Sequence, residues 1–250
     1  MNANADQSYC LAIVPARGGS KGLPGKNLLT VGDKSLVRLA VEAALNSGVC
    51  HRVICSTDSP AIAEEARRAG GDVPFLRPAE LASDSAASVD VMIHAVTQIE
   101  QELGRAIDCV CLVEPTSPLR TGADIRLAMQ RLQDADPQAD SVVSLCEVND
   151  AHPAWLRRMD QGCVVPYFDT LAEPTRRQDL NRHPTPYRRN GAVYITRRSV
   201  LMEQRSIYGR RCLGYVMPPE RSVNIDSQMD LLCARAMWQH LHGTQKDGTK

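Results

Sequence analysis

Short runs rich in β-branched residues alternate along this chain with longer stretches of helical periodicity, and this alternation limits the folds that the sequence can adopt. The first four runs are each followed by a helical stretch: "YCLAIVPA" by Ser35–Ser47, "RVICSTD" by Pro60–Ala69, "VPFLRP" by Ala86–Leu103, and "DCVCLVEP" by Ala123–Gln133. A fifth run, "SVVSLCEV", comes next. The rhythm predicts an α/β fold, with a mostly parallel sheet and helices on both of its faces.

The rhythm fails between Asn149 and Arg189, where five prolines accompany the basic cluster "RRQDLNRHPTPYRRNG". Such a long irregular stretch inside a compact domain is usually functional or part of an interface. The pattern then resumes with "GAVYITRR", "RCLGYVMP" and an amphipathic helix from about Ser227 to Leu241. We therefore expect a single domain over residues 1–250, with residues 149–189 as an inserted extension.

The charge balance and the apolar runs exclude several classes of partner. The 29 basic and 29 acidic residues give zero net charge, which does not favour nucleic acid, and no apolar run is long enough to span a membrane. The first ten residues are polar and lack the basic start of a signal peptide, so a cytoplasmic protein is expected.

Cys109 and Cys111 would share one face of a strand, and the nine cysteines are expected to be reduced.

The loop after the first predicted strand, "ARGGSKGLPGKNL", carries the strongest chemical signal. It would lie at the carboxyl edge of the sheet, where α/β proteins bind ligands. It is neither a P-loop, because Ser20 and Asn27 replace the required glycine and hydroxyl residue, nor a G-x-G-x-x-G fingerprint. Arg17, Lys21 and Lys26 are interleaved with glycines, which predicts a polyphosphate-binding loop more readily than a solvated basic turn.

Several motifs, taken together, resemble one known family. "PARGGSKGLPGKNL" resembles the signature of the CMP-sialic acid synthetases, or acylneuraminate cytidylyltransferases. The resemblance continues in order through "STDS", "FLRPAELASDSAAS", "PTSPLRTGADI", "RRQDL", "NGAVYI" and "NIDSQMDL". It implies a Rossmann-like nucleotidyltransferase fold and an enzyme that joins CTP to a nine-carbon α-keto acid sugar, releasing pyrophosphate with the help of Mg²⁺.

The resemblance also implies how the nucleotide is held. Arg17, Lys21 and Lys26 would bind the triphosphate, and Asn27 with the backbone at Ala16 would read the cytosine. Cations placed near the departing phosphates would stabilise the charge that grows on them.

Two further residues are expected near the base and ribose of the nucleotide, namely Arg77 and Ser88. The alternative interpretation is structural: Arg77 would pair with Glu80, and Ser88 would be an ordinary helix residue.

The segment "VNIDSQMD" is expected to hold the metal, with Asp226 as the first ligand. Asp226 is also expected to be a catalytic residue, together with Arg17 and Lys21. The family often has Asp-x-Asp at this position, whereas this chain has Asn224 as the first of the pair. The Asn224 carbonyl can coordinate a cation but contributes no negative charge.

The resemblance places the sugar contacts at Arg177, Gln178, Arg188 and Tyr194, and the neighbouring member of each Arg-Arg pair remains an alternative. A planar guanidinium suits the sugar carboxylate because it can bind both oxygens at once.

Two departures from the family pattern bear on the sugar itself. Glu114 stands where the sialic acid enzymes commonly have glutamine, so the pocket would favour a donor group; alternatively, Glu114 pairs with Arg120 or binds the metal. Trp155 stands where some of those enzymes carry a lysine, and its apolar face suits a deoxy or N-acylated sugar. The hypothesis is a substrate of the legionaminate or pseudaminate kind.

The extension over residues 149–189 resembles the dimerisation element of the family, which implies a homodimer whose sugar sites are completed by the partner chain. Two other functions remain as alternatives: a cytidylyltransferase for an eight-carbon keto-deoxy sugar, and a nonenzymatic CTP-binding module. Asn224 and Glu114 invite the second alternative, whereas Lys21, Lys26 and Asp226 oppose it.

Overall fold

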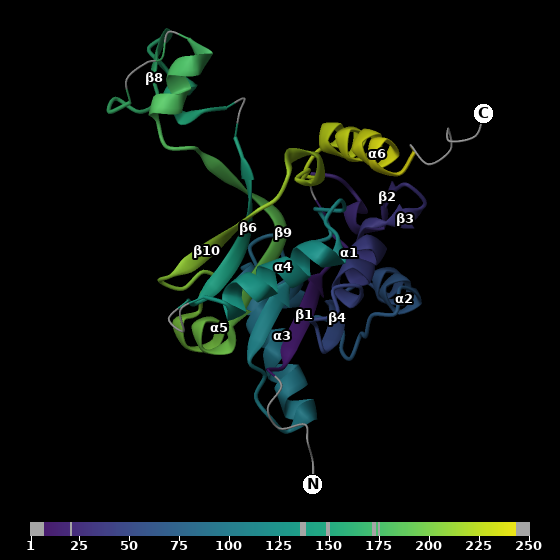
Figure 1. The fold of residues 1–250 in the computed structure, drawn as a ribbon. Helices are drawn as coiled ribbons and strands as arrows, with labels where there is room; N and C mark the ends of the chain where they lie inside the picture. The colour runs from purple at the N-terminus through teal and green to yellow at the C-terminus, as the bar shows by residue number, and fades with distance from the viewer. Residues whose placement is uncertain are drawn as a thin grey trace, which may run out of the picture.

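A six-stranded sheet forms the centre of the molecule (Figure 1). The computed structural model describes residues 8–20, 22–135, 139–148, 151–171, 174 and 176–243, apart from the side chains at 181 and 182. The strand order is β10-β6-β9-β5-β1-β4, and β9 is the strand that runs antiparallel to its neighbours. The strands are β1 (Cys10–Pro15), β4 (Arg52–Ser56), β5 (Cys109–Leu112), β6 (Ser141–Glu147), β9 (Tyr187–Arg197) and β10 (Cys212–Val216).

Helices cover both faces of this sheet, as the sequence predicts. One buried cluster joins the sheet to α1, α2 and α4, and a second joins its other face to α3 and α5. A third cluster packs α6 against the small hairpin β2–β3. The helices are α1 (Leu36–Leu45), α2 (Pro60–Arg68), α3 (Ser88–Leu103), α4 (Gly122–Gln133), α5 (Arg198–Gln204) and α6 (Gln228–Gly243), and the hairpin strands are β2 (Thr30–Val31) and β3 (Lys34–Ser35).

Local sequence explains where the elements begin. Ser35 and Ser59 accept hydrogen bonds from backbone N–H groups in the first turns of α1 and α2, and Thr121 forms a capping box with Asp124 at the start of α4. In β1, alternate residues enter the two core clusters, so the strand is apolar throughout. The predicted α/β fold with a mostly parallel sheet is confirmed.

The prediction that Cys109 and Cys111 share one face of a strand is confirmed. Cys109 and Cys111 are buried in the same core cluster, on one face of β5. All nine cysteines are free thiols.

Some expected elements differ from those observed. The stretch "VPFLRP" is not a strand: an isolated bridge between Ile54 and Asp72 precedes it, and Val73 and Phe75 then pack against the core without forming a strand. Helix α5 and the hairpin β2–β3 are not evident from the sequence because both are short. The helix has seven residues, and the hairpin consists of two residue pairs.

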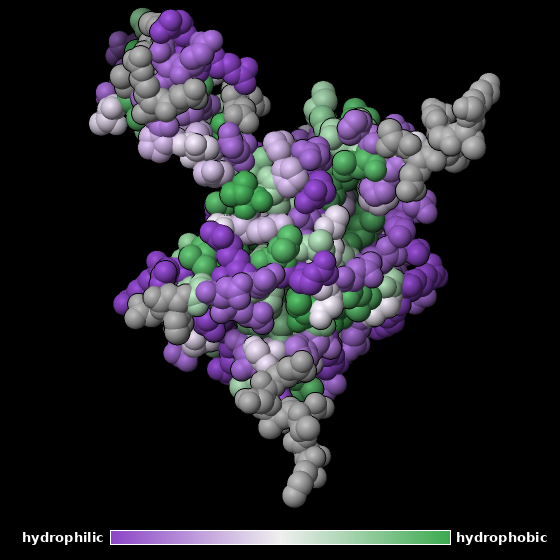
Figure 2. All heavy atoms as spheres, viewed as in Figure 1, coloured by the Kyte–Doolittle hydropathy of each residue, from purple (hydrophilic) through white to green (hydrophobic). Residues whose placement is uncertain are grey.

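The extension projects from the body as an arm, defined here as residues 151–186 without the gaps noted above (Figures 1 and 2). It leaves the sheet after β6 and returns as β9, which begins at Tyr187, so the inserted segment ends slightly earlier than predicted. Its elements are η3 (Pro153–Trp155), β7 (Arg157–Asp160), β8 (Cys163–Pro166) and η4 (Arg177–Arg182), and β7 and β8 form a hairpin. Across the described ranges, the helices lack the length and apolar character needed to cross a membrane.

Candidate active site

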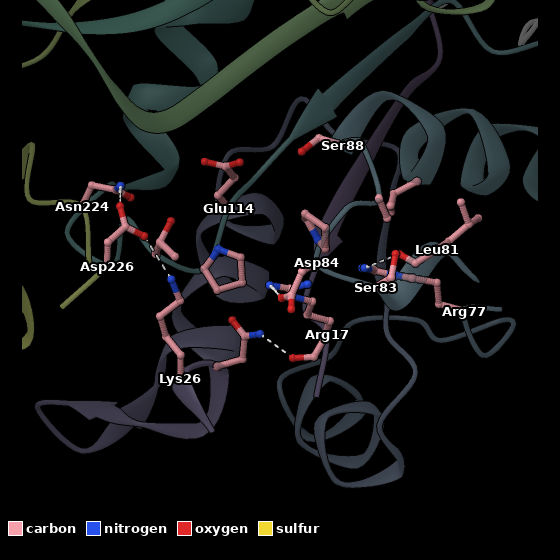
Figure 3. A pocket seen from close by; sticks show the side chains of 16 residues that line it. Arg17, Lys26, Arg77, Leu81, Ser83, Asp84, Ser88, Glu114, Asn224 and Asp226 are labelled. Atoms are coloured by element: carbon pink, nitrogen blue, oxygen red, sulfur yellow. Dashed lines mark hydrogen bonds and ion pairs between the residues drawn. The ribbon is translucent and has the colours of Figure 1, made fainter. Parts of the chain in front are cut away.

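A cavity of about 420 Å³ opens at the carboxyl ends of β1 and β5, where the predicted polyphosphate loop also lies (Figure 3). Glu114, Asn224 and Asp226 lie toward one end of it, and Arg77 and Ser88 lie at the other (Figure 3). Its polar lining consists of Arg17, Lys26, Asn27, Arg77, Ser83, Asp84, Ser88, Glu114, Thr116, Asn224 and Asp226.

Arg17 follows β1 directly and enters the cavity. Its guanidinium forms an ion pair with Asp84, with an Nη2–Oδ1 distance of 2.6 Å. The backbone around it is fixed, because Gly18 N–H donates to Asp58 and the Asn27 amide donates to the Arg17 carbonyl at 2.9 Å. A phosphate-sized anion would therefore meet a cation held on a rigid loop.

Lys26 links the loop to the segment before α6. Its ammonium donates to the Ile225 carbonyl at 3.0 Å and to Asp226 Oδ1 at 3.1 Å. The other carboxylate oxygen of Asp226, Oδ2, accepts a bond of 2.8 Å from the Asn224 side-chain amide. Two residues far apart in the sequence, Lys26 and Asp226, thus meet at one end of the cavity.

Glu114 comes from the loop after β5 and faces the same end of the cavity. Burial raises the pKa of its carboxyl group; the positive charge of Arg120 opposes this rise and the negative charge of Asp226 adds to it. The alternative in which the Glu114 carboxylate pairs with Arg120 is not found, since the Arg120 guanidinium donates instead to the backbone carbonyls of Glu114 and Ser117.

The two predicted base and ribose contacts, Arg77 and Ser88, both line the cavity. Arg77 does not pair with Glu80: it is buried and donates to Ser56 and to the Leu81 carbonyl. Ser88 is the first residue of α3 and lines the cavity.

The backbone N–H of Ala16 is already bonded to the Ser56 carbonyl, so it is not available to a base in this arrangement. Lys21 lies outside the described residues, and its role as a phosphate ligand stays a prediction.

The expected sugar-binding residues other than Glu114 do not line this cavity within one chain. Trp155, Arg177 and Gln178 belong to the arm, and Arg177 lines a separate cavity of about 230 Å³ there. Arg188, at the base of the arm, donates to the Ser222 carbonyl at 3.0 Å, and Tyr194, a residue of β9, is buried in the core. The arm thus carries three of these residues, Trp155, Arg177 and Gln178, away from the cavity of the same chain.

Three residues near the cavity were missed by sequence analysis. Asp84 pairs with Arg17, and its place in "LASDSAAS" was the only available signal. Ser117 Oγ lies 2.9 Å from the Asn190 carbonyl and 3.3 Å from Asn224 Oδ1. Gly191 has a φ of 72° and brings its backbone against the side chains of Glu114, Ser117 and Asn224.

The residues at the acidic end fit a hard divalent cation. Asp226 and Glu114 supply carboxylate oxygens and Asn224 supplies a carbonyl oxygen, which are the ligands that Mg²⁺ prefers. The missing side chain of Gly191 leaves space beside them, since a Cβ there would lie 3.1 Å from Glu114 Oε2 and Asn224 Oδ1. Within the described ranges, no cluster of three His, Cys, Asp or Glu residues could hold a metal by itself, so phosphates and waters would have to complete the coordination.

Comparisons with known proteins agree with this geometry. The family model described as "Cytidylyltransferase" matches residues 11–228. The chain is 34% identical to the CMP-N,N'-diacetyllegionaminic acid synthase of Legionella pneumophila, over 88% of this chain and 92% of that protein. It is also 34% identical to the N-acylneuraminate cytidylyltransferase of Escherichia coli, over 92% of this chain but only 52% of that protein, so it spans about half of that relative.

A similar fold occurs in a solved structure of CMP:2-keto-3-deoxy-manno-octonic acid synthetase complexed with CTP. The TM-score is 0.67 with 18% identity, covering 94% of this chain and all of the other, so the likeness concerns the fold alone. The family match extends from β1 into the first residue of α6 and includes every described residue that lines the cavity. The chain belongs to the cytidylyltransferase family of nucleotidyltransferases.

Proposed function

We propose that this protein transfers the cytidylyl group of CTP to the anomeric hydroxyl of a nonulosonic acid, with release of pyrophosphate. The hydroxyl oxygen loses its proton to solvent and forms a bond to the α-phosphorus as the bond between the α-phosphorus and the oxygen that bridges it to the β-phosphorus breaks. The observation that carries this proposal is the cavity that Arg17 and Lys26 line together with Asp226 and Asn224, where Lys26 contacts Asp226. The named activities of the two relatives support the same reaction.

The residues of the cavity divide the work between the two substrates. Arg17 and Lys26 would bind the phosphates and stabilise the charge that develops on the leaving pyrophosphate. Arg77 and Ser88, at the other end, would hold the base and ribose, and Asn27 would steady the loop through its bond to the Arg17 carbonyl.

Mg²⁺ would be held by Asp226 and Asn224. When bound, it supplies positive charge to the phosphate oxygens and neutralises charge as the leaving group departs. Lys26 would keep one Asp226 oxygen in place, and the Asn224 amide would hold the other. Each carboxylate oxygen has a second lone pair, so both contacts leave Asp226 able to coordinate.

The sugar would be a modified nonulosonic acid of the legionaminate or pseudaminate kind. Relatives named for N-acylneuraminate and for diacetyllegionaminate are equally identical to this chain, so identity does not separate these sugars. Glu114 favours a donor group on the sugar, and Trp155 offers an apolar face to an acyl or deoxy group. These two side chains are the basis for the preference.

The working form would be a homodimer in which the arm of one chain completes the sugar site of the other. A two-stranded hairpin is marginally stable alone, so β7–β8 needs a surface to pack on. Met159 and Val164 are paired across the hairpin and are 68% and 66% exposed. Such apolar exposure on a projecting arm is typical of an interface, and the free thiols of the described chain fit a reducing, cytoplasmic location.

The proposed reaction is tested by pyrophosphate release from purified protein with CTP and Mg²⁺. N-acetylneuraminate, diacetyllegionaminate, diacetylpseudaminate and the eight-carbon keto-deoxy sugar are offered separately. We expect the highest kcat/KM with one of the two diacetylated sugars. Equal or better turnover of N-acetylneuraminate would contradict the sugar preference. A higher kcat/KM with the eight-carbon sugar would show that the substrate is an eight-carbon keto-deoxy sugar and not a nonulosonic acid.

A further inference from the structure

Glu114 and Asn224, from loops more than a hundred residues apart, face each other across the backbone of Gly191. A Cβ built on Gly191 would lie 3.1 Å from Glu114 Oε2 and the same distance from Asn224 Oδ1, so the two oxygens are no further apart than twice that distance. Figure 3 shows both residues at the end of the cavity that also holds Asp226. Only a glycine at position 191 leaves this space open.

The orientation of the Asn224 amide is set by its hydrogen bonds. Its nitrogen donates to Asp226 Oδ2 at 2.8 Å, which leaves its carbonyl oxygen on the side of Glu114 and Ser117. The Ser117 hydroxyl has a single proton and a shorter contact to the Asn190 carbonyl, 2.9 Å against 3.3 Å to Asn224. The Asn224 carbonyl therefore keeps lone pairs for another partner.

The carboxyl group of Glu114 has no donor of its own in the described part of the chain. Arg120, the nearest candidate, is engaged with backbone carbonyls. A half-buried carboxylate without donors is costly unless a cation approaches it. Asp226, by contrast, already has a donor on each of its oxygens.

We propose that Glu114 is a ligand of the divalent cation, together with the Asn224 carbonyl and Asp226. The second carboxylate of the site thus comes from the loop after β5 and not from position 224. The site holds two carboxylates and one amide, whose nitrogen donates to Asp226 and whose carbonyl oxygen lies beside Gly191, as does Glu114 Oε2. This inference rests on the proposed function, because the cation is the one that accompanies the nucleotide. With Glu114 bound to the cation, the preference for a modified nonulosonic acid rests on Trp155 alone.

The exchange of charge makes a direct test possible. Glu114→Gln leaves one carboxylate at the site, Asn224→Asp adds a third, and the double variant returns to two with the carboxylate on the other side of Gly191. Glu203→Gln, an exposed glutamate on α5, is the matched control.

The measurement is Mn²⁺ binding, followed by the loss of the electron paramagnetic resonance signal of free Mn²⁺ when protein is added to a mixture of Mn²⁺ and CTP without sugar, relative to the same mixture without protein, since CTP alone also binds Mn²⁺. We expect Glu114→Gln to weaken Mn²⁺ binding by about tenfold or more. Mutation of residues that only hydrogen-bond to metal ligands already lowers metal affinity by about this factor. The double variant is expected to recover most of the loss, and Glu203→Gln to bind like the wild type. Thermal melting and CTP binding in EDTA check that the variants are folded.

Mn²⁺ affinity unchanged within twofold in Glu114→Gln, or a double variant no better than the single one, would overturn the proposal; so would a wild type that does not bind Mn²⁺. The proposed function fails separately: a wild type that makes no CMP-sugar, but whose Mn²⁺ binding depends on Glu114, would leave the ligand assignment standing. If the wild type makes a CMP-sugar but Glu114→Gln binds Mn²⁺ as tightly as the wild type, only the assignment of Glu114 as a ligand is wrong.

Discussion

Asp84 holds Arg17 across the cavity, with 2.6 Å between Oδ1 and Nη2, so a carboxylate contacts the guanidinium where a phosphate of the nucleotide is expected. The two side chains come from the loop after β1 and the loop before α3, which are joined through this contact. Binding of a triphosphate to Arg17 would have to compete with Asp84.

Replacing this carboxylate should therefore strengthen nucleotide binding. We expect Asp84→Asn to lower the KM for CTP by about two- to fivefold with little change in kcat, the range for a partly exposed ion pair. Steady-state kinetics at saturating sugar measure this. Glu64→Gln, which removes a surface pair with Arg68 on α2, is the control and should change neither constant. A rise in the KM for CTP would instead mean that Asp84 assists the nucleotide.

Lys26 should be essential for turnover because it contacts Asp226 and lies where the phosphates are expected. We predict that Lys26→Met lowers kcat/KM by about 10²- to 10³-fold, as the removal of an electrostatic stabiliser of a transition state commonly does. Lys34→Met is the matched control, since Lys34 pairs with Glu42 on α1 and does not line the cavity. Activity within threefold of wild type in Lys26→Met, with normal melting, would remove Lys26 from the mechanism.

The body of the fold was predictable because its signals are local. Apolar runs such as β1, caps such as Ser59 and the glycine-rich loop each fix a short stretch of backbone independently of the rest. The run "VPFLRP" misled because its apolar residues cover the sheet edge without pairing to it.

The site was predictable only in part. Arg17, Lys26 and Asp226 stand in motifs, so their types and positions could be predicted from the sequence. The contacts of Asp84 and Gly191 depend on loops that meet only after folding, and no periodicity encodes them.

The pH dependence of stability should reveal the environment of Glu114. Its pKa is raised in the folded state, mainly by burial, so the native protein holds this proton more tightly than the unfolded chain does. Between the ordinary glutamate pKa and the raised one, this group makes stability fall as pH rises. The free energy of unfolding of Glu114→Gln, measured in urea from pH 4 to pH 8, should improve relative to wild type over that interval. A constant difference across the range would contradict the raised pKa.

The arm should control assembly and the sugar site without affecting CTP. We expect wild type to be a dimer by light scattering, and the double variant Met159→Glu/Val164→Glu to be a monomer at about 10 µM, because buried like charges at an interface cost several kcal/mol. The monomer should bind CTP normally but lose turnover.

Arg158→Gln, at the neighbouring position on the same strand, is the control for this comparison, because alternate residues of a strand point to opposite faces. It should remain a dimer. A fully active monomeric wild type would contradict both the dimer and the shared sugar site.

Transfer of CMP to a nonulosonic acid is tested most directly by mass-spectrometric detection of the product. Wild type, Lys26→Met and Lys34→Met are incubated with CTP, Mg²⁺ and diacetyllegionaminate or diacetylpseudaminate, and each mixture is searched for the CMP-sugar and for an equal amount of pyrophosphate. The account predicts both products with wild type and Lys34→Met, and little of either with Lys26→Met. CTP binding without a CMP-sugar from these sugars, from N-acetylneuraminate or from the eight-carbon sugar would contradict it and favour a nonenzymatic CTP-binding role.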